Sequence, residues 1–220
     1  MSDVSLDSHL PDNQGVPRRT EVLRASPPMF RSRWLDRLSR VHPIVPPLIF
    51  IPAITVLTVA GATHLAAWKI VAGLAGGYAF WTFCEYWIHR VVFHWEPEKG
   101  IGARLHWMMH GVHHDHPNDP LRLVMPPAVS VPLAGLFIGV FVLVLGTPLA
   151  WPVGAGFLAG YLLYDMLHYA LHHHRNASSG LERRLRELHM RHHFEDETRG
   201  YGISAPYWDA VFGTFARRGR

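Results

Sequence analysis

Ten of the 17 histidines in this 220-residue chain fall into four spaced sets, and these sets carry the strongest chemical signal in the sequence. Two sets are triplets with the same spacing, in LHWMMHGVHH and LHMRHH, and two are pairs, in EYWIHRVVFH and YDMLHYALH. The residues are His89 and His94; His110, His113 and His114; His168 and His172; and His189, His192 and His193. Neutral imidazole is a good ligand for iron, zinc and copper, so the repeated spacing indicates metal binding.

Helix geometry suggests how the rings of each set are directed. Residues i, i+3 and i+4 share one face of an α-helix, so each triplet can aim three rings at one point, and His168 and His172 can do so as a pair. His89 and His94 differ, because five residues on a regular helix rotate the second ring by about 140°. If both are ligands, a π-bulge or a helix break is needed near residues 90–93. No single ion takes ten imidazoles, so we expect two metals with about five nitrogens each.

The other histidines carry weaker signals. His106, His116, His173 and His174 neighbour the sets, and we expect them to hydrogen-bond behind the ligands rather than to ligate. Three more, His9, His42 and His64, lie apart and are expected to be ordinary interfacial rings. The Glu-x-x-His motif of soluble four-helix di-iron proteins is absent from the sequence.

Four apolar stretches must position these sets: residues 44–60, 66–84, 127–146 and 148–167. At about 1.5 Å of rise per residue, each approaches the roughly 30 Å of a bilayer's hydrocarbon core. Their internal Gly and Pro residues are tolerated in membrane helices. We therefore expect an all-α integral membrane protein with four transmembrane helices in two hairpins. The alternative is a soluble helical protein, but so small a domain could hardly bury four helices that are apolar on every face.

The charged residues indicate an orientation and a class of partner. The apolar stretches form two pairs, 44–60 with 66–84 and 127–146 with 148–167. Of the 21 Lys and Arg residues, only Lys69 lies within a pair or between its two members. The positive-inside rule then places both termini, the middle loop and every histidine set on the cytoplasmic side. We attribute the pI of about 9.5 to arginines that attract anionic lipid headgroups, and we expect no nucleic-acid partner. The single cysteine, Cys84, excludes an internal disulfide framework and a Cys-based zinc site.

The chain is long enough for one functional unit with a sizeable core. Residues 1–40 are Pro-rich and polar, and they predict a disordered arm followed by a short basic interfacial helix in RSRWLDRLSR. Residues 41–220 form the expected membrane-embedded domain, and no cleavable signal peptide is expected. The abundance of Arg, Ala and Gly favours a bacterial inner membrane, with the endoplasmic reticulum as the eukaryotic equivalent.

From about Glu85 to Phe215 the chain resembles the fatty acid hydroxylase superfamily of histidine-rich membrane oxygenases, and within it the sphingolipid fatty acid 2-hydroxylases. The order of the four histidine sets carries the resemblance, together with the stretches EYWIHR, RLVMPP, GYLLYDMLHYALHH and GYGISAPYWDAVFGT. Sterol desaturase-type relatives share the histidine sets. The resemblance implies a dimetal centre on the cytosolic side of the membrane bundle, beneath a cap of amphipathic helices, with all ten histidines as ligands.

The resemblance also implies roles near the centre. Tyr164 and Asp165 match a Tyr-Asp pair associated with the active site. An acid at a membrane helix end is costly without a partner, so we expect Asp165 to hydrogen-bond behind the metal ligands. The alternative is an ordinary interfacial aspartate. Glu85 stands one turn before His89 and has the same two interpretations. Aromatic residues are candidates to line a lipid slot or to anchor the protein at the interface: Trp81, Tyr86, Trp87, Trp95 and Trp107.

The implied reaction inserts one oxygen atom of O2 at C2 of a long acyl chain, either a free acid or the N-acyl chain of a ceramide-like lipid. The functional metals would be two iron ions, because zinc is redox-inert, although zinc can occupy such a site in isolated protein. Eukaryotic 2-hydroxylases commonly carry an N-terminal cytochrome b5 domain, for which the first forty residues are too few. We therefore expect a separate electron donor, such as a cytochrome b5-like protein, a ferredoxin or a reductase, docking on the basic cytoplasmic face.

Two other functions stay open from the sequence. The same centre could desaturate an acyl chain or hydroxylate a sterol or carotenoid, since spacing does not reveal cavity shape. A histidine-rich metal transporter or sensor is the alternative from another class. It predicts ionisable residues within the spans, and residues 48–60 and 128–146 offer none.

Overall fold

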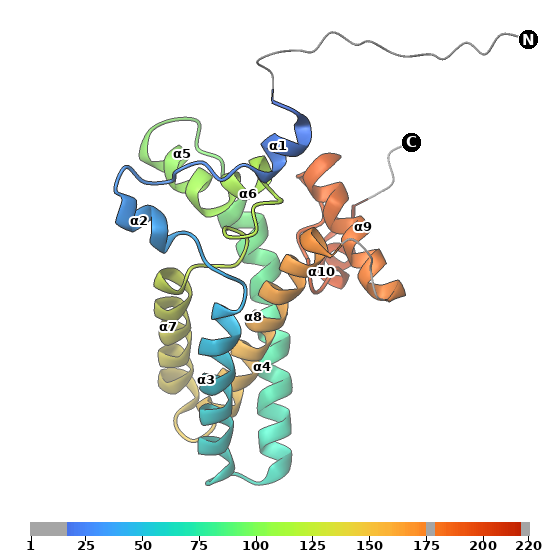
Figure 1. The fold of residues 1–220 in the computed structure, drawn as a ribbon. Helices are drawn as coiled ribbons and strands as arrows, with labels where there is room; N and C mark the ends of the chain where they lie inside the picture. Colours follow the sequence, from blue (N-terminus) through green and yellow to red (C-terminus); the bar gives the residue numbers. More distant parts are fainter. Residues whose placement is uncertain (1–16, 175–178, 217–220) are drawn as a thin grey trace, which may run out of the picture.

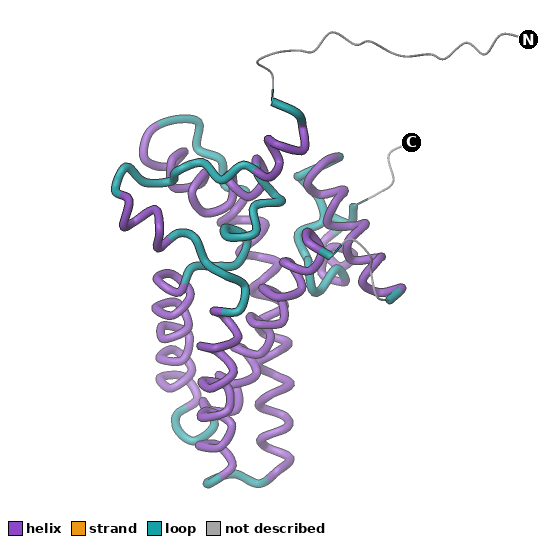
Figure 2. The backbone as a smooth tube through the Cα atoms, viewed as in Figure 1, coloured by secondary structure: helices purple, strands orange, loops and turns teal. Residues whose placement is uncertain are grey.

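Every regular element in the described part of the chain, residues 17–174 and 179–216, is a helix in this computed structural model. Four long helices form a stem, and the short helices gather as a cap at one end of it (Figures 1 and 2). The stem consists of α3 (Val45–Ala62), α4 (Ala67–Trp87), α7 (Pro127–Leu145) and α8 (Ala150–His173). The cap consists of α1 (Arg19–Arg24), α2 (Arg33–Leu38), η1 (Ile88–Phe93), α5 (Gly100–His106), η2 (Trp107–Gly111), α6 (Val112–Asp115), α9 (Gly180–Phe194) and α10 (Tyr207–Phe212).

Each stem helix coincides with one of the four apolar stretches, and α8 is the helix at their centre. It packs against α3, α4 and α7. Glycines allow α4 and α8 to approach closely, because a Cβ on Gly77 would lie 1.9 Å from the carbonyl oxygen of Val153, and one on Gly156 would lie 2.0 Å from that of Leu74. Aromatic rings fill the remaining space, with Trp81 edge-on to Phe157. This packing fixes α4 and α8 relative to each other, and both continue toward the cap with histidines at their ends.

The outward surfaces of α3 and α7 are apolar. These two helices are long and apolar enough to cross a membrane, and only 17% and 11% of their most apolar windows are buried. Leu143 and Val144 illustrate this, since their side chains are 85% and 74% exposed. The core helix of a soluble protein would bury such residues. Among the described residues, α4 and α8 do not reach the same hydropathy. Asp165 and the histidines lower the mean hydropathy of α8. This helix can carry them because it lies at the centre of the stem, where the other helices enclose it.

The described residues of the N-terminal arm pack against the rest of the cap, where the sequence predicted disorder before a short helix. The expected helix is present as α2, and α1 precedes it. The amide of Asn118 donates to the carbonyl of Leu23 over 2.9 Å, and that of Val41 donates to Leu121 over 2.6 Å. These main-chain bonds give the arm partners that composition alone did not indicate. Residues 1–16, which include His9, lie outside the described residues.

Candidate metal centre

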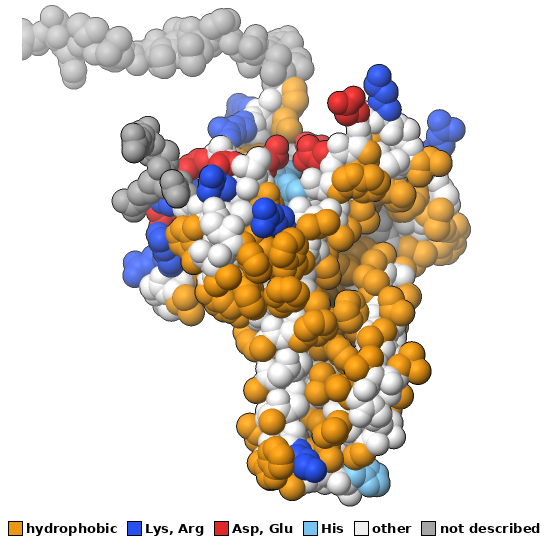
Figure 3. Space-filling view, turned by 180° about the vertical axis from the view of Figure 1, so that it is seen from behind, with side chains coloured by type: hydrophobic (Ala, Val, Ile, Leu, Met, Phe, Trp, Pro, Cys, Tyr) orange, Lys and Arg blue, Asp and Glu red, His pale blue; other side chains and the backbone are white. Residues whose placement is uncertain are grey.

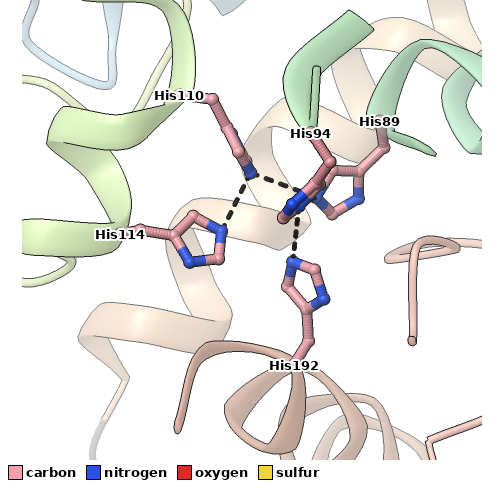
Figure 4. Close-up of side chains that lie close together, drawn as sticks. All are labelled: His89, His94, His110, His114 and His192. Atoms are coloured by element: carbon pink, nitrogen blue, oxygen red, sulfur yellow. Dashed lines mark hydrogen bonds between the residues drawn. The ribbon is translucent and has the colours of Figure 1, made fainter. Parts of the chain in front are cut away.

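The ten patterned histidines gather beneath the cap as two groups of five. Within each group the potential ligand atoms all lie within 4.8 Å of one another. The first histidine group comprises His89, His94, His110, His114 and His192, and Figure 4 shows their rings directed toward one another. The second histidine group comprises His113, His168, His172, His189 and His193. The two groups adjoin, since the rings of His114 and His193 stack across the boundary with centroids 4.2 Å apart.

A π-helical turn brings His89 and His94 together, as the five-residue spacing required. In η1 the amide of His94 bonds to the carbonyl of His89 over 3.2 Å, a bond that spans five residues instead of four. The Nε2 atoms of the two rings consequently lie 3.3 Å apart. A second π-helix, η2, contains His110, and no sequence signal indicated it.

The two triplets do not aim three rings at one point, so that expectation is wrong. Each triplet gives its i and i+4 rings to one group: the Nε2 atoms of His110 and His114 are 2.9 Å apart, and those of His189 and His193 are 3.2 Å apart. The i+3 rings cross to the other group, where His113 meets His168 at 3.0 Å and His192 meets His94 at 3.1 Å. Successive helical residues are about 100° apart, so neighbouring rings at i+3 and i+4 diverge toward two different centres.

The donor atoms fit metal ions. The Nδ1 atom of His89 lies 2.7 Å from the carbonyl oxygen of Tyr201, and that of His192 lies 2.7 Å from the carbonyl oxygen of Arg199. A carbonyl only accepts, so each Nδ1 carries the proton and each Nε2 presents a lone pair to the group. Burial, followed by repulsion from neighbouring rings, lowers the pKa of His94 to about 3 and that of His114 to about 2. Neutral rings that direct their lone pairs toward one point are suited to hold a metal cation there.

Two buried carboxylates hold the loop that supplies these carbonyls. Asp209 accepts hydrogen bonds from the amides of Tyr201 and Gly202 at 2.9 and 2.8 Å. Glu85 accepts from the amide of Ser204 at 2.7 Å and also from its hydroxyl. Glu85 therefore supports His89 through the loop rather than by direct contact. The sequence analysis assigned no role to Asp209, although an acid within the aromatic stretch APYWDAVFGT was a usable signal.

Tyr164 and Asp165 lie at the level of the second histidine group, on α8. The ring of Tyr164 stacks on that of His168, with centroids 5.8 Å apart. Asp165 accepts a hydrogen bond from the amide of Met125 at 3.2 Å and one from the hydroxyl of Tyr161 at 3.4 Å. Burying an acid in an apolar helix is costly unless it has hydrogen-bond partners, and Asp165 has two. Through Met125 it also fixes the segment that leads into α7.

The neighbouring histidines serve other contacts. His116 lies 2.6 Å from the carbonyl of Val22 and so joins the arm to the cap. The ring of His173 packs on Tyr169, with centroids 4.3 Å apart, and exposed His174 lies 3.5 Å from Glu182. His106 is a partly buried neighbour of the first histidine group. His42 and His64 are exposed residues outside both groups.

A cavity of about 100 Å³ adjoins both groups, and His110, His113 and His168 form part of its wall. Its remaining wall comes from the arm, η1, η2, α6, the segment before α7, and α8, and includes Tyr164 and Asp165. The five aromatic residues proposed for a lipid slot do not line it. Trp81 packs in the stem, Tyr86 bonds to Thr214, Trp87 packs on Phe212, Trp95 is exposed and Trp107 donates to Asp115.

Comparisons with known proteins agree with this geometry. Dihydroceramide fatty acyl 2-hydroxylase FAH2 of Arabidopsis thaliana is 36% identical over 86% of this chain and 79% of its own length. The ceramide very long chain fatty acid hydroxylase SCS7 of Saccharomyces cerevisiae is 33% identical over 87% of this chain, which spans 50% of that protein. Fatty acid 2-hydroxylase of Homo sapiens is 39% identical over 63% of this chain, which spans 38% of it.

A solved structure and a family model place the likeness over the site. The structure described as full length scs7p, with only the hydroxylase domain visible, superposes with a TM-score of 0.76 at 32% identity, covering 83% of this chain and 70% of that one. The fatty acid hydroxylase family model matches residues 74–214, which contain all ten patterned histidines. This chain belongs to the fatty acid hydroxylase family.

Proposed function

We propose that this protein is a membrane-bound, O2-dependent monooxygenase that hydroxylates C2 of long-chain fatty acyl groups, including the N-acyl chain of ceramide-like lipids. The observation that carries the proposal is the pair of five-histidine groups beside one shared cavity. The relatives' names supply the substrate class, since they are a dihydroceramide fatty acyl 2-hydroxylase, a ceramide very long chain fatty acid hydroxylase and a fatty acid 2-hydroxylase.

Each histidine group would hold one iron ion through its Nε2 atoms. When bound, iron supplies the redox and O2 chemistry that redox-inert zinc cannot supply. The protein's own part is to fix the ring tautomers through the carbonyls of Arg199 and Tyr201 and to keep the rings neutral by burial. The cavity holds the acyl chain so that one methylene lies against the centre.

Tyr164 and Asp165 contribute by contact and by position, respectively. Tyr164 lines the cavity beside His168, so its ring contacts the acyl chain next to the reacting carbon. Asp165 fixes Met125, which also lines the cavity, through the amide of that residue. Neither role requires a proton transfer.

In the membrane, we assign all four stem helices as spans, with the cap and both histidine groups on the cytoplasmic side. The apolar exposure of α3 and α7 supports this, as does the pairing of each with α4 or α8 in a hairpin. In Figure 3 the charged side chains gather over the cap, while the stem is largely apolar apart from its far tip. The positive-inside rule then sets the orientation, in a bacterial inner membrane or in the endoplasmic reticulum.

Two electrons would come from a separate donor, such as a cytochrome b5-like protein, a ferredoxin or a reductase. Partly exposed rings offer a route for them, because His94, His114 and His193 are less buried than the other ligands. A carrier docked on the cap would approach the centre from this side.

The test combines metal analysis of the purified protein with a mass-spectrometric screen of candidate lipids, supplied with O2 and a reducing system. We expect about two irons per chain and a product heavier by one oxygen, placed at C2 by fragmentation. A product lighter by two hydrogens would identify a desaturase instead. Oxygen found only on a sterol or carotenoid would identify a different hydroxylase of the same family.

A further inference from the structure

The arm folds around a single carboxylate, that of Asp36. This side chain accepts a hydrogen bond from the amide of Met29 at 2.8 Å, from Nε of Arg40 at 3.1 Å and from Nη2 of Arg122 at 2.8 Å. Arg40 also donates to Ser26, through both its hydroxyl and its carbonyl. Burial raises the pKa of Asp36, but these hydrogen bonds and the two guanidinium charges outweigh it, so the pKa lies below its ordinary value and the group stays ionised.

Arg122 ties this arrangement to the segment between α6 and α7. Its guanidinium donates to Asp36 and to the carbonyl of Pro27, and Asp119 lies 4.0 Å from its Nε. The Arg122 side chain is only 2% exposed, and its single charge is balanced by two carboxylates. It is therefore committed to holding the arm, and an anionic lipid headgroup would find no uncompensated positive charge there.

The same segment forms one wall of the cavity beside the histidines. Met29 and Ser39 line the cavity from the arm, and Met108, Met109 and Met125 line it from other elements. Unbranched methionine side chains adapt to irregular, flexible ligands. A lipid lying in this cavity would be enclosed between the arm and the histidine rings.

The cavity lining changes in polarity from the arm toward the stem. Ser39 belongs to the arm and Arg122 is hydrogen-bonded to it, whereas Pro126 directly precedes α7 and Tyr164 lies within α8. Asp165 also lies within α8, but its oxygens are used by Met125 and Tyr161. An acyl tail therefore fits toward the stem, and the polar end of the lipid fits toward the arm.

We propose that residues 26–40 form a selectivity wall that sets the size of the lipid headgroup, with Met29 as the specificity-determining residue and the Asp36–Arg122 ion pair as the latch. The inference rests on the proposed lipid hydroxylation. The wall lies outside residues 74–214, the part matched by the family model, so headgroup selectivity would reside in a segment separate from the family's histidine framework.

The experiment gives the purified iron-loaded protein an equal mixture of ceramide and glucosylceramide with the same acyl chain, and it measures the ratio of the two 2-hydroxylated products. Met29→Ala should raise the ratio of hydroxylated glucosylceramide to hydroxylated ceramide about tenfold, and Met29→Trp should lower that ratio about tenfold, because side-chain size in a pocket discriminates between ligands. Leu35→Ala is the matched control, because Leu35 lies on the same segment, is 50% exposed and does not line the cavity.

The latch has its own readout. Asp36→Asn should raise KM for both lipids and increase the glucosylceramide share, while kcat for ceramide and the iron content stay near wild type. Asp36→Glu, which keeps the charge, should recover most of the selectivity. A purely structural role would lower kcat and iron content together and leave the product ratio unchanged.

Native mass spectrometry of the same protein, without reductant, should show the same shift in the ratio of bound lipids. Unchanged product and bound-lipid ratios in both Met29 variants would overturn the selectivity wall. Failure of the proposed function looks different: the wild-type protein, fully loaded with iron and reduced, would release no hydroxylated lipid, while the bound-lipid ratio would still test the wall.

Discussion

The two histidine groups have the same number of rings but are held in different ways. In the first, the rings of His89 and His192 are fixed by carbonyls of one loop, and that loop is in turn held by Asp209 and Glu85. In the second, His168 and His172 project from α8, the central stem helix. The second group also contains two buried Nδ1 atoms, in His189 and His193, that have no hydrogen-bond partner among the described residues.

This difference separates two ways of building a metal site. The first group depends on hydrogen bonds behind the rings of His89 and His192, which fix both the tautomer and the ring orientation. The second depends on the packing of whole helices, which fixes the main-chain positions from which the histidine side chains project. Loop substitutions should therefore affect mainly the first group, and changes in stem packing should affect mainly the second.

The largest effect should come from removing a ring. His113→Ala should reduce hydroxylation below detection and lower bound iron from about two ions per chain toward one, because metal sites rarely tolerate the loss of a ligand. Product analysis and metal analysis of membrane-inserted protein would measure both. His64→Ala, an exposed histidine outside both groups, is the control, and full activity in His113→Ala would remove that residue from the ligand set.

A smaller effect is expected from Asp209→Asn. The asparagine side chain lacks the negative charge that holds the main-chain amides of Tyr201 and Gly202. The carbonyl of Tyr201 would then orient His89 less firmly. We expect metal at the first group to bind about 10- to 100-fold more weakly, with the second group little changed. A chelator titration should resolve two steps in the variant, and exposed Glu98→Gln should behave as wild type. Equal weakening of both sites would remove the proposed distinction.

The smallest effect should come from stem packing, where two adjacent glycines form a matched pair. Gly77→Ala places a methyl group against the Val153 carbonyl and should cost about 1–3 kcal/mol of stability. Gly76→Ala meets nothing within 4 Å and should be neutral or slightly stabilising. Thermal unfolding measures the difference, and metal release from Gly77→Ala should begin at the second group. Indistinguishable melting temperatures would show that the close approach of α4 and α8 is not a constraint.

The sequence predicted much of this site because the relevant information is local. The spacing of His89 and His94 required a widened helical turn, and η1 provides it. The partition of the triplets could not be predicted in the same way. Spacing fixes the angle between rings on one helix, but which neighbouring ring completes each group depends on how α6, α8 and α9 meet.

The parts that the sequence did not reveal depend on distant contacts. Asp209 acts on His89 through Tyr201, and although its aromatic neighbourhood marks the acid as unusual, it does not indicate that connection. The arm looked irregular by composition, yet Asp36 finds Arg122 across 86 positions of the chain. The four apolar stretches did predict four stem helices, although membrane crossing by these helices is still a proposal.

The widened turn of η1 has a consequence for how such sites tolerate insertions. Four residues separate His89 from His94, and three separate His168 from His172, yet the ring centroids of the two pairs are 5.0 and 5.2 Å apart. An added residue absorbed as one π-turn leaves the spacing between the rings almost unchanged. Shortening the first pair by one residue should therefore let an ordinary α-turn hold the same two nitrogens, so a strict count of intervening positions is a poor criterion for recognising this kind of centre.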